Sequence, residues 1–510
     1  MESIINAIVA EPPEPGHRLR LVELHGTQTI GLPELHETAG RLAGRLREEG
    51  VRPGDRIGIL AANCLEWVLL DLAALRLGVV TAGFEPGKFE GDGELLARYD
   101  LELLFTDRGE AAGVGGVRAI KEVGSLAEAP PHVAEPHVAG PPAVRYEPGD
   151  VTTLKFTSGS TGQPKGLAAS VGSIDSSLRA VQEMFQHGPE DDLFVFLPLS
   201  LLQQRYWIYS ALRYGHDVTV STYEAAFMAM RQTRPTVVMG VPGFYETAKK
   251  HIEARADATG VTREEAARRL FGDRIRYLWT GSAPASAALL RFFGSVGLPI
   301  YEGYGLNETC IVSKNHPGAH REGSVGRVLP GKHVLLDEAG AISVRADFPV
   351  NTRYEYARPG ESERMFGPDG TVRTGDVGHI DEDGFLYIHG RADDTLVLDN
   401  GKKIVVRPVE EAMKADPEIA ECVIFCLGQS RLVAVVSPAR TPADEAAIAA
   451  RLAQTNAALE RDERIWKVVI ADPPFTIDGG TLTSQFKPKR NRIHDLYRPE
   501  IHDSDRGIHA

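Results

Sequence analysis

Apolar residues recur along the chain with two different spacings, which predict alternating helices and strands. Between Pro33 and Gly50, the apolar positions 35, 39, 42, 43 and 46 share one helical face, and Pro53 lies just beyond. Residues 56–61 and 101–106 have the short apolar runs of buried strands, and residues 64–77 have the pattern of an apolar helix. This alternation is typical of parallel sheets covered by helices.

The alternation continues through the middle of the chain, and two changes of pattern follow it. Further strands are expected near residues 193–197, 217–220, 236–241, 274–279 and 298–301. After Gly323, short apolar runs separated by Gly, Pro and Asp turns predict a β-rich subdomain. Beyond Asp393 a smaller α/β unit is expected, with helices near 408–414 and 442–459 and strands near 420–427 and 432–437.

These patterns predict the fold class α/β, with two domains. A large N-terminal domain, residues 1–392, would contain helix-covered sheets and the β-rich subdomain, and residues 393–510 would form the small C-terminal α/β domain. The length of 510 residues fits this division, because single cores rarely grow so large. Six prolines between Ser125 and Asp150 predict an irregular surface segment.

Composition excludes several classes of protein. The formal net charge of −14 argues against nucleic acid or an anionic membrane as the main partner. No apolar run reaches the ~20 residues that span a bilayer, and residues 1–10 lack the basic start of a signal peptide. Four cysteines in 510 residues cannot form a disulfide framework, which favours a reducing, cytoplasmic location.

The most polar, glycine-rich stretch runs from Thr157 to Gly166, directly after a β-prone run. It contains three glycines, four hydroxyl side chains and Lys165, none of which could fill a core. Glycines let backbone N–H groups approach phosphate oxygens closely, and the hydroxyls and the lysine add donors and charge. Because Pro164 precedes the lysine and Gly166 follows it, the spacing is not that of a P-loop NTPase. The stretch predicts a different polyphosphate site.

Residues 157–166 resemble the phosphate-binding signature of the adenylate-forming superfamily, which includes acyl-CoA synthetases, nonribosomal adenylation domains and luciferases. Further motifs follow in the family's order, so the resemblance covers nearly the whole chain. Residues 301–309 are similar to the second signature, in which Glu308 would hold magnesium together with Thr157. Asn307 stands where the family usually has Thr or Ser.

Two segments resemble the third signature, and another resembles the adenine wall. Asp376, within residues 373–378, would hold the ribose hydroxyls, and Arg391 would serve the same nucleotide as a cation. Residues 280–284 resemble the segment that lines the adenine. The resemblance implies a nucleotide-binding set of Thr157, Ser158, Gly159, Ser160, Thr161, Gly162, Lys165, Gly281, Ser282, Ala283, Pro284, Glu302, Gly303, Tyr304, Gly305, Asn307, Asp376 and Arg391.

The resemblance also assigns roles to the small domain, which rotates about a hinge in this family. Asp393 would be the hinge, and Gly401, Lys402 and Lys403 would lie on the coenzyme A side. Residues 482–490 look like the lysine-bearing motif of the long-chain acyl-CoA synthetase branch. Alignment puts the catalytic lysine at Lys487, with Lys489 as the alternative, and Glu308 and Lys165 complete the catalytic set. A basic surface tail remains the competing interpretation of this segment.

The implied acyl pocket comprises Leu201, Tyr206, Trp279 and Gly303. The long-chain branch usually has a histidine at the position of Leu201, and Trp279 is large for a wall that often carries a small residue. These departures either reshape specificity or impair adenylation, and the sequence does not choose between them.

The implied reaction joins a hydrophobic carboxylic acid, long-chain or bulky, to coenzyme A through an acyl-adenylate, with ATP, Mg²⁺ and coenzyme A as cofactors. Three alternatives stay open: thioesterification of a preformed adenylate only, loading of a carrier protein in place of coenzyme A, or a non-catalytic nucleotide-binding homologue. No nucleic acid or integral membrane partner is expected. The oligomeric state, with a homo-oligomer as one option, and the pathway stay open.

Overall fold

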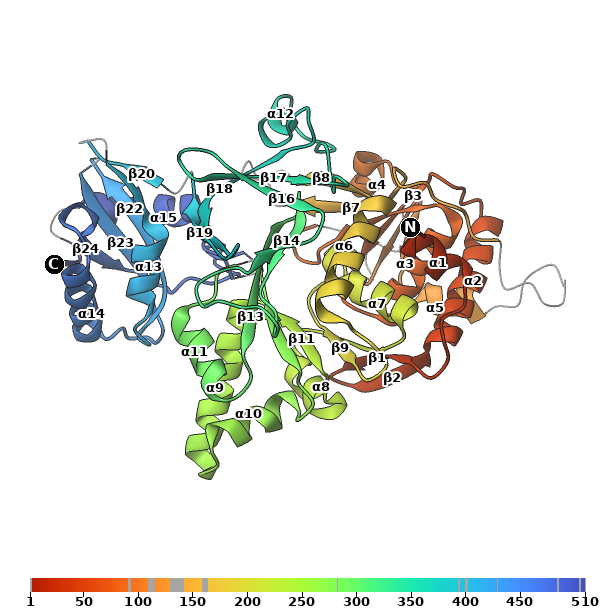
Figure 1. The fold of residues 1–510 in the computed structure, drawn as a ribbon, viewed down its shortest axis with the longest axis horizontal. Coiled ribbons are helices and arrows are strands. Elements are labelled where there is room, and N and C mark those ends of the chain that lie inside the picture. The colour runs from red at the N-terminus through yellow and green to blue at the C-terminus, as the bar shows by residue number, and fades with distance from the viewer. Residues whose placement is uncertain are drawn as a thin grey trace.

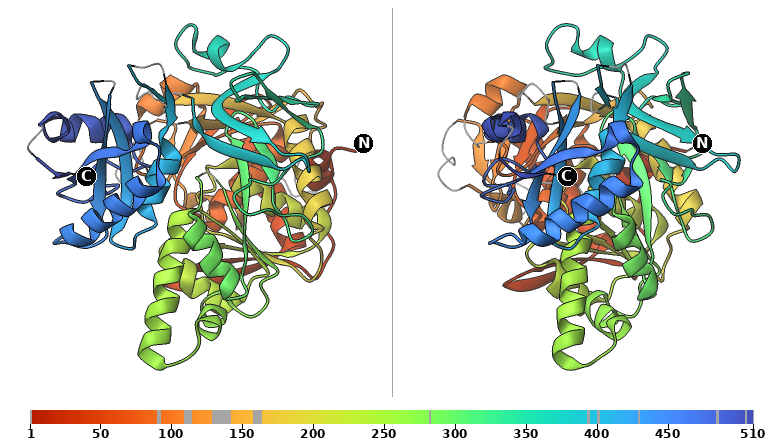
Figure 2. Two further views of the ribbon diagram at one scale, coloured as in Figure 1. Left: turned by 60° about the vertical axis from the view of Figure 1, so that its left-hand side comes forward. Right: turned by 90° about the vertical axis from the view of Figure 1, so that its left-hand side faces the viewer.

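A computed structural model describes residues 2–89, 93–108, 115–128, 142–157, 164–281, 283–392, 395–399, 402–428, 430–483, 486–503 and 506–509. It has the mixed α/β architecture predicted from the sequence. Figure 1 shows the small C-terminal unit, in blue, beside a larger body that contains the rest of the chain, and both views of Figure 2 keep them adjacent. Asp393, the predicted boundary and hinge, lies outside the described residues.

The first sheet has six strands in the order β6-β5-β3-β4-β7-β8, all parallel except for the β7–β8 pair. The predicted strands at 56–61 and 101–106 are its strands β3 and β5. The strand bounds are β3 Arg56–Leu60, β4 Val80–Phe84, β5 Leu103–Thr106, β6 Val117–Ala119, β7 Val151–Thr157 and β8 Lys165–Ser170.

The second sheet has nine strands in the order β15-β14-β13-β12-β11-β9-β10-β1-β2. Six neighbouring strands, from β13 to β1, are parallel, and antiparallel strands close each edge. The five strands predicted between residues 193 and 301 all belong to it. The bounds are β1 Arg18–Glu23, β2 Gly26–Gly31, β9 Asp192–Val195, β10 Asp217–Ser221, β11 Val237–Gly240, β12 Tyr277–Thr280, β13 Ile300–Leu306, β14 Cys310–Lys314 and β15 Arg327–Val328.

The β-rich subdomain and the small unit supply three further sheets. The predicted subdomain is the antiparallel sheet β16-β17-β18-β19, and the small unit contains β20-β21 and β22-β23-β24-β25. The bounds are β16 Lys332–Leu336, β17 Ala341–Ala346, β18 Val372–Ile380, β19 Leu386–Arg391, β20 Thr395–Val397, β21 Lys403–Val405, β22 Ile419–Leu427, β23 Arg431–Pro438, β24 Ile465–Ile470 and β25 Ile508–His509.

Helices cover the sheets at the positions that the apolar spacing predicts, including 33–50, 64–77, 408–414 and 442–459. The helix predicted at 64–77 ends at Gly78, whose positive φ of 76° suits glycine. The bounds are α1 Ile4–Ala10, α2 Leu32–Glu48, α3 Leu65–Leu77, α4 Gly93–Tyr99, α5 Glu122–Glu128, α6 Val171–Phe185, α7 Leu202–Tyr214, α8 Ala226–Thr233, α9 Pro242–Thr259, α10 Arg263–Phe271, α11 Ala287–Ser295, α12 Glu361–Met365, α13 Val406–Lys414, α14 Glu445–Ala458, the 3₁₀ helix η1 Arg461–Glu463 and α15 Arg490–His502.

Alternate residues of strand β9 show how the core is divided. Leu193 and Val195 belong to a buried cluster shared with α2, α3, α6, α7 and strands of both large sheets. Phe194 and the following Phe196 point the other way, into a second cluster with α8 to α11. The nine-stranded sheet is therefore covered on both faces. Within the described part of the chain, no helix combines the length and apolar character needed to cross a bilayer.

Two histidines are buried in the larger cluster. The ring of His187 stacks near Phe185, and its Nε2 lies 2.5 Å from the Tyr277 hydroxyl. His216 is fully buried and contacts the Ser210 hydroxyl at 2.9 Å through Nε2. Desolvation lowers the pKa of both histidines well below the ordinary value of 6.5.

We expect acid to destabilise the fold through this pair. With folded pKa values below 6.5, the unfolded state binds more protons, so the histidines' contribution to stability is complete above about pH 6.5 and is lost as pH falls. Urea unfolding of His187→Gln, compared with wild type at pH 8, 6 and 5, should show a smaller loss of stability on acidification. Equal pH dependence in both proteins would contradict the prediction.

Candidate active site

Lys165 and Glu308 are brought together through one tyrosine. Lys165, at the start of β8, pairs with Glu361 Oε1 at 3.2 Å, and its Nζ lies 4.9 Å from the centre of the Tyr354 ring. The Tyr354 hydroxyl donates to Glu308 Oε1 at 2.7 Å. Tyr354 therefore contacts Lys165 at its ring face and the buried Glu308 carboxylate through its hydroxyl, although the two residues lie far apart in the sequence. The predicted loop residues 158–162 lie outside the described residues, as does the side chain of Thr157.

Glu308 has the properties of a ligand for a hard cation. It is buried, and Asn351 Nδ2 donates to its backbone carbonyl at 3.0 Å, which fixes the turn. Within the described part of the chain, no hydrogen bond is made to its second carboxylate oxygen, Oε2. A carboxylate oxygen that keeps its lone pairs in such a setting suits Mg²⁺.

Asp376 is held between an aromatic hydroxyl and a guanidinium. Tyr304 donates to Asp376 Oδ2 at 2.5 Å, and Arg391 Nη1 lies 3.2 Å from Oδ1. The antiparallel register of β18 and β19 places Asp376 opposite Arg391. Gly375 has a φ of +72°, and a Cβ there would lie 2.5 Å from Arg391 Nη2. Glycine suits this positive φ, which other residues rarely adopt.

Lys487 of the small unit lies within electrostatic range of Asp376 and Arg391. Desolvation lowers the pKa of the Lys487 amino group, the nearby charge of Asp376 opposes that shift, and Arg391 adds to it. The preceding residue, Phe486, packs against the large domain, with its ring 6.1 Å from that of Tyr223. Lys489, the alternative candidate, is exposed at the N-terminal end of α15. Lys487 is half-buried and close enough to Asp376 and Arg391 for both charges to act on its amino group.

The predicted adenine wall follows strand β12, whose Thr280 pairs with Glu302 of β13. Ala285 N donates to Glu302 Oε1 at 3.0 Å, which ties the segment after Pro284 to the strand. Burial raises the pKa of Glu302, while Arg407 and Lys314 oppose the shift. Gly281 and Ala283 are half-buried here, and Ser282 lies outside the described residues. Asn307 is exposed, but its carbonyl accepts a hydrogen bond from Asn351 Nδ2 at 3.2 Å.

The predicted acyl pocket corresponds to a cavity of about 50 Å³. Leu201, Trp279 and Gly303 line it, whereas Tyr206 does not. Tyr206 is buried in the core, with its hydroxyl 3.6 Å from Cys310 Sγ. The lining residues are Leu197, Leu201, Gln203, Gln204, Met239, Gly240, Val241, Trp279, Gly281, Gly303, Tyr304, Gly305 and Ile311.

Of the residues predicted for the coenzyme A side, the structure describes the side chain of Lys402. Lys402 pairs with Glu460 Oε2 at 2.6 Å, and that contact raises its pKa. Gly401 and the side chain of Lys403 lie outside the described residues. Their role stays a prediction that concerns another position of the small domain.

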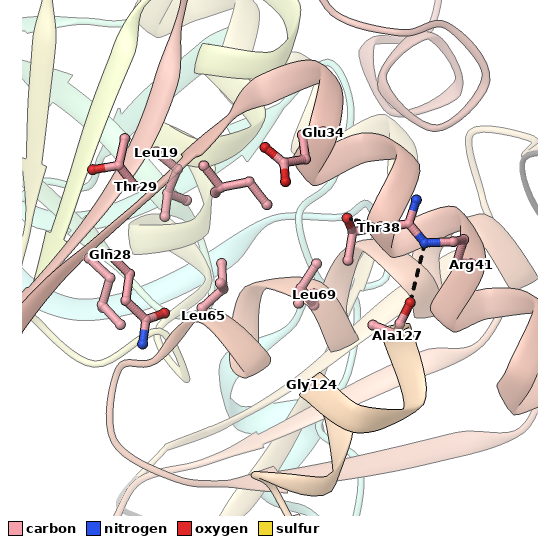
Figure 3. A pocket seen from close by; sticks show the side chains of 12 residues that line it. Leu19, Gln28, Thr29, Glu34, Thr38, Arg41, Leu65, Leu69, Gly124 and Ala127 are labelled. Carbon is pink, nitrogen blue, oxygen red and sulfur yellow. Dashed lines mark hydrogen bonds between the residues drawn. The ribbon is translucent and has the colours of Figure 1, made fainter. Parts of the chain in front are cut away.

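A larger cavity, of about 290 Å³, lies away from these residues, among β1, β2, α2, α3 and α5 (Figure 3). Arg41 borders it and donates through Nε to the Ala127 carbonyl at 3.2 Å. None of the candidate site residues lines this cavity. Its lining residues are Leu19, Leu21, Gln28, Thr29, Ile30, Glu34, Thr38, Arg41, Leu65, Leu69, Gly124 and Ala127.

Sequence reasoning missed three residues of the site. Lys155 of β7 is buried, and its Nζ donates to the Asn307 carbonyl, so it fixes the turn that carries Glu308. Burial lowers the pKa of Lys155. A lysine between Leu154 and Phe156 of this strand was the available signal. Tyr354 and Glu361 follow no such pattern, because they belong to an irregular segment and a short helix that only the fold brings to Lys165.

The comparisons with known proteins agree with this geometry. Residues 13–346 match the family of AMP-binding enzymes, and residues 393–504 match the C-terminal domain of AMP-binding enzymes. The long-chain-fatty-acid–CoA ligase FadD15 of Mycobacterium bovis is 28% identical, over 89% of this chain and 88% of the relative. FadD13 of Mycobacterium tuberculosis, a long-chain-fatty-acid–CoA ligase, is 24% identical over 77% of this chain and 79% of the relative.

Two solved structures share the fold. ATP-bound MatB from Rhodopseudomonas palustris superposes with a TM-score of 0.80 at 22% identity, covering 98% of this chain and 99% of that one. The o-succinylbenzoate CoA synthetase MenE of Bacillus subtilis, bound to its acyl-adenylate, gives 0.77 at 21% identity, covering 97% and 98%. The family match extends over well more than half of the sequence and confirms the resemblance of its motifs; the chain belongs to the family of AMP-binding enzymes.

Proposed function

We propose that the protein is an AMP-forming acyl-CoA ligase that joins a hydrophobic carboxylic acid to coenzyme A. The observation that carries this proposal is the position of Lys487. It belongs to the small unit, its neighbour Phe486 packs near Tyr223 of the large domain, and the charges of Asp376 and Arg391 act on its amino group. A cation on a separate domain can stabilise charge during one step and be withdrawn for the next. The CoA ligases among the relatives support the same reaction.

In the first step, a carboxylate oxygen of the acid attacks the α-phosphorus of ATP, the bond to the β-phosphate oxygen breaks, and pyrophosphate leaves. Asp376 would hold the ribose, and Lys165 would hold the β- and γ-phosphates with the loop of residues 157–166. Lys487 would stabilise the negative charge that builds on the α-phosphate and the attacking carboxylate. Positioning and electrostatics account for catalysis in transfers of this kind.

Glu308 fits the requirement for magnesium, since its buried carboxylate keeps one oxygen for a cation. Thr157 is the second proposed ligand. When bound, Mg²⁺ would neutralise charge on the phosphates and on the pyrophosphate that leaves. The chain itself holds Glu308 in place through Tyr354 and Asn351.

In the second step, the coenzyme A thiol loses its proton, its sulfur attacks the acyl carbonyl carbon, and AMP leaves with the oxygen that came from the acid. We propose that the small domain, residues 393–510, turns about Asp393 between the steps and brings residues 401–403 to the site.

Acyl-CoA formation tests the proposal. The protein is incubated with ATP, Mg²⁺, coenzyme A and a panel of hydrophobic acids, and thioesters and AMP are measured by mass spectrometry. We expect thioester and AMP in equal amounts. An acceptor other than coenzyme A is indicated if AMP forms but the thioester appears only with a phosphopantetheinylated carrier protein. Absence of both products overturns the proposal.

Tyr354 should matter through Glu308 rather than through the substrate. In Tyr354→Phe the ring under Lys165 remains, but the hydrogen bond to Glu308 is lost. Because partners of metal ligands orient them, we expect the apparent affinity for Mg²⁺ to fall by about 10- to 100-fold. Magnesium titrations of adenylation activity measure this. Phe366→Leu, which changes a ring packed against Tyr354, is the control and should leave the Mg²⁺ dependence unchanged.

A further inference from the structure

The small cavity proposed to hold the acyl group is bordered by a tightly packed tryptophan, Trp279. Trp279 is only 4% exposed. Its ring lies edge-on to Trp207, with ring centres 5.2 Å apart, and stacks near Phe185 at 5.7 Å. The cavity of about 50 Å³ is far below the roughly 300–1,000 Å³ of sites that enclose drug-sized ligands.

Lys314 fixes the ring from a third direction. It pairs with Gly303 across strands β13 and β14, is 1% exposed, and places Nζ 3.3 Å from the centre of the Trp279 ring. The same amino group donates to the Tyr301 carbonyl at 3.2 Å. The negative face of an indole attracts such N–H groups, so Lys314 and Trp279 hold one another.

The lysine stem also supports the wall at Gly303. A Cβ at position 303 would lie 2.7 Å from Lys314 Cδ. The stem therefore fills the space directly behind the glycine, although Lys314 itself does not line the cavity. A second carboxylate on the acyl group would find no counter-ion there. The wall suits an acyl group that carries no charge.

One polar group faces the cavity without a partner. Gln204, on the first turn of α7, lines the cavity and is 1% exposed. Its Oε1 is buried and has no hydrogen-bond partner among the described residues, and its Nε2 lies 4.0 Å from Met239 Sδ. A buried amide left unpaired is costly, so a ligand group that bonds to it is favoured.

Resting on the proposed function, we infer that the preferred acid is a compact, uncharged acyl group with one hydrogen-bonding substituent, such as a single-ring hydroxy or amino acid of the benzoate type. Lys314 and Trp279 limit the length of the acyl group, and Gln204 forms a hydrogen bond with the substituent. This differs from the long-chain acids in the relatives' names.

The test compares benzoate, the hydroxybenzoate isomers, hexanoate and palmitate. Wild type should give the highest kcat/KM with a hydroxybenzoate, about 5- to 100-fold above benzoate, since one buried hydrogen bond is gained. Palmitate should be the poorest. Gln204→Leu, which keeps the volume, should bring hydroxybenzoate and benzoate to similar values. Trp279→Ala should raise activity with palmitate relative to benzoate, and Lys314→Met should do so to a smaller extent.

Binding separates this inference from the proposed function. Sulfamoyl analogues of the corresponding acyl-adenylates are not turned over, and their effect on thermal stability measures binding alone. A larger stabilisation by the hydroxybenzoyl analogue than by the palmitoyl analogue supports the inference even if no acid is activated, an outcome that would overturn the ligase proposal alone. Equal or stronger binding of the palmitoyl analogue, or a hydroxyl preference unchanged in Gln204→Leu, overturns the inference.

Discussion

Replacing Lys487 with alanine is expected to slow acid-dependent adenylation by about 10²- to 10³-fold, the size of the loss when one preorganised donor to a developing charge is removed. Lys487 is half-buried, and the charges of Asp376 and Arg391 act on its amino group, so water cannot take over its role fully. Pyrophosphate release from ATP and acid measures this step. Thioester formation from presynthesised acyl-adenylate should stay within about 3-fold of wild type, because no charge builds on an α-phosphate there.

Lys489→Ala is the matched control. It removes an exposed lysine two residues away in the same motif and should leave both half-reactions near wild type. Equal loss in both half-reactions of Lys487→Ala would indicate a defect of folding or domain packing. Loss in Lys489→Ala alone would move the catalytic role to Lys489.

Replacing Asp71 with alanine is expected to lower the free energy of unfolding by about 3–5 kcal/mol, since it leaves a buried cation uncompensated. Arg205 Nη1 lies 2.7 Å from Asp71 Oδ1, the Tyr209 hydroxyl donates to Oδ2 at 2.5 Å, and both charged side chains are nearly inaccessible to water. This group joins α3 to α7. Urea unfolding followed by tryptophan fluorescence measures the loss.

The double variant Asp71→Leu with Arg205→Met is the control for that prediction. Apolar residues that replace both members of a buried ion pair are often neutral or stabilising, so its stability should recover to near wild type. A single Asp71→Ala variant as stable as wild type would show that the pair contributes little to holding the two helices.

The helices and strands that were predicted are those with a strong local signal, whereas β1, β2 and β14 were not predicted. The length and period of the apolar positions predict strand β9 and helix α2. Gly78 adopts the positive φ at which helix α3 ends. The order of the strands has no local signal. That β1 pairs with β10, almost 200 residues later, follows from how whole layers bury their faces.

Only the site residues that lie in short motifs could be proposed from the sequence. Glu308, Asp376 and Arg391 lie in continuous signatures. In the structure, Tyr304 contacts Asp376, and Tyr354 and Asn351 contact Glu308. Lys314 and Arg205 could not be foreseen, since a charged residue in a strand or helix normally faces water. Only the fold turns Lys314 against Trp279. Tyr206 was expected in the pocket because it follows Leu201 closely, but its position on α7 directs it into the core.

The central claim is that the acid is activated as its adenylate, and the path of one oxygen atom tests it most directly. The protein is given a carboxylic acid labelled with ¹⁸O in both carboxylate oxygens, together with ATP, Mg²⁺ and coenzyme A. The account predicts one ¹⁸O in AMP and one retained in the thioester carbonyl. Label in inorganic phosphate with formation of ADP, or AMP without label, would contradict it.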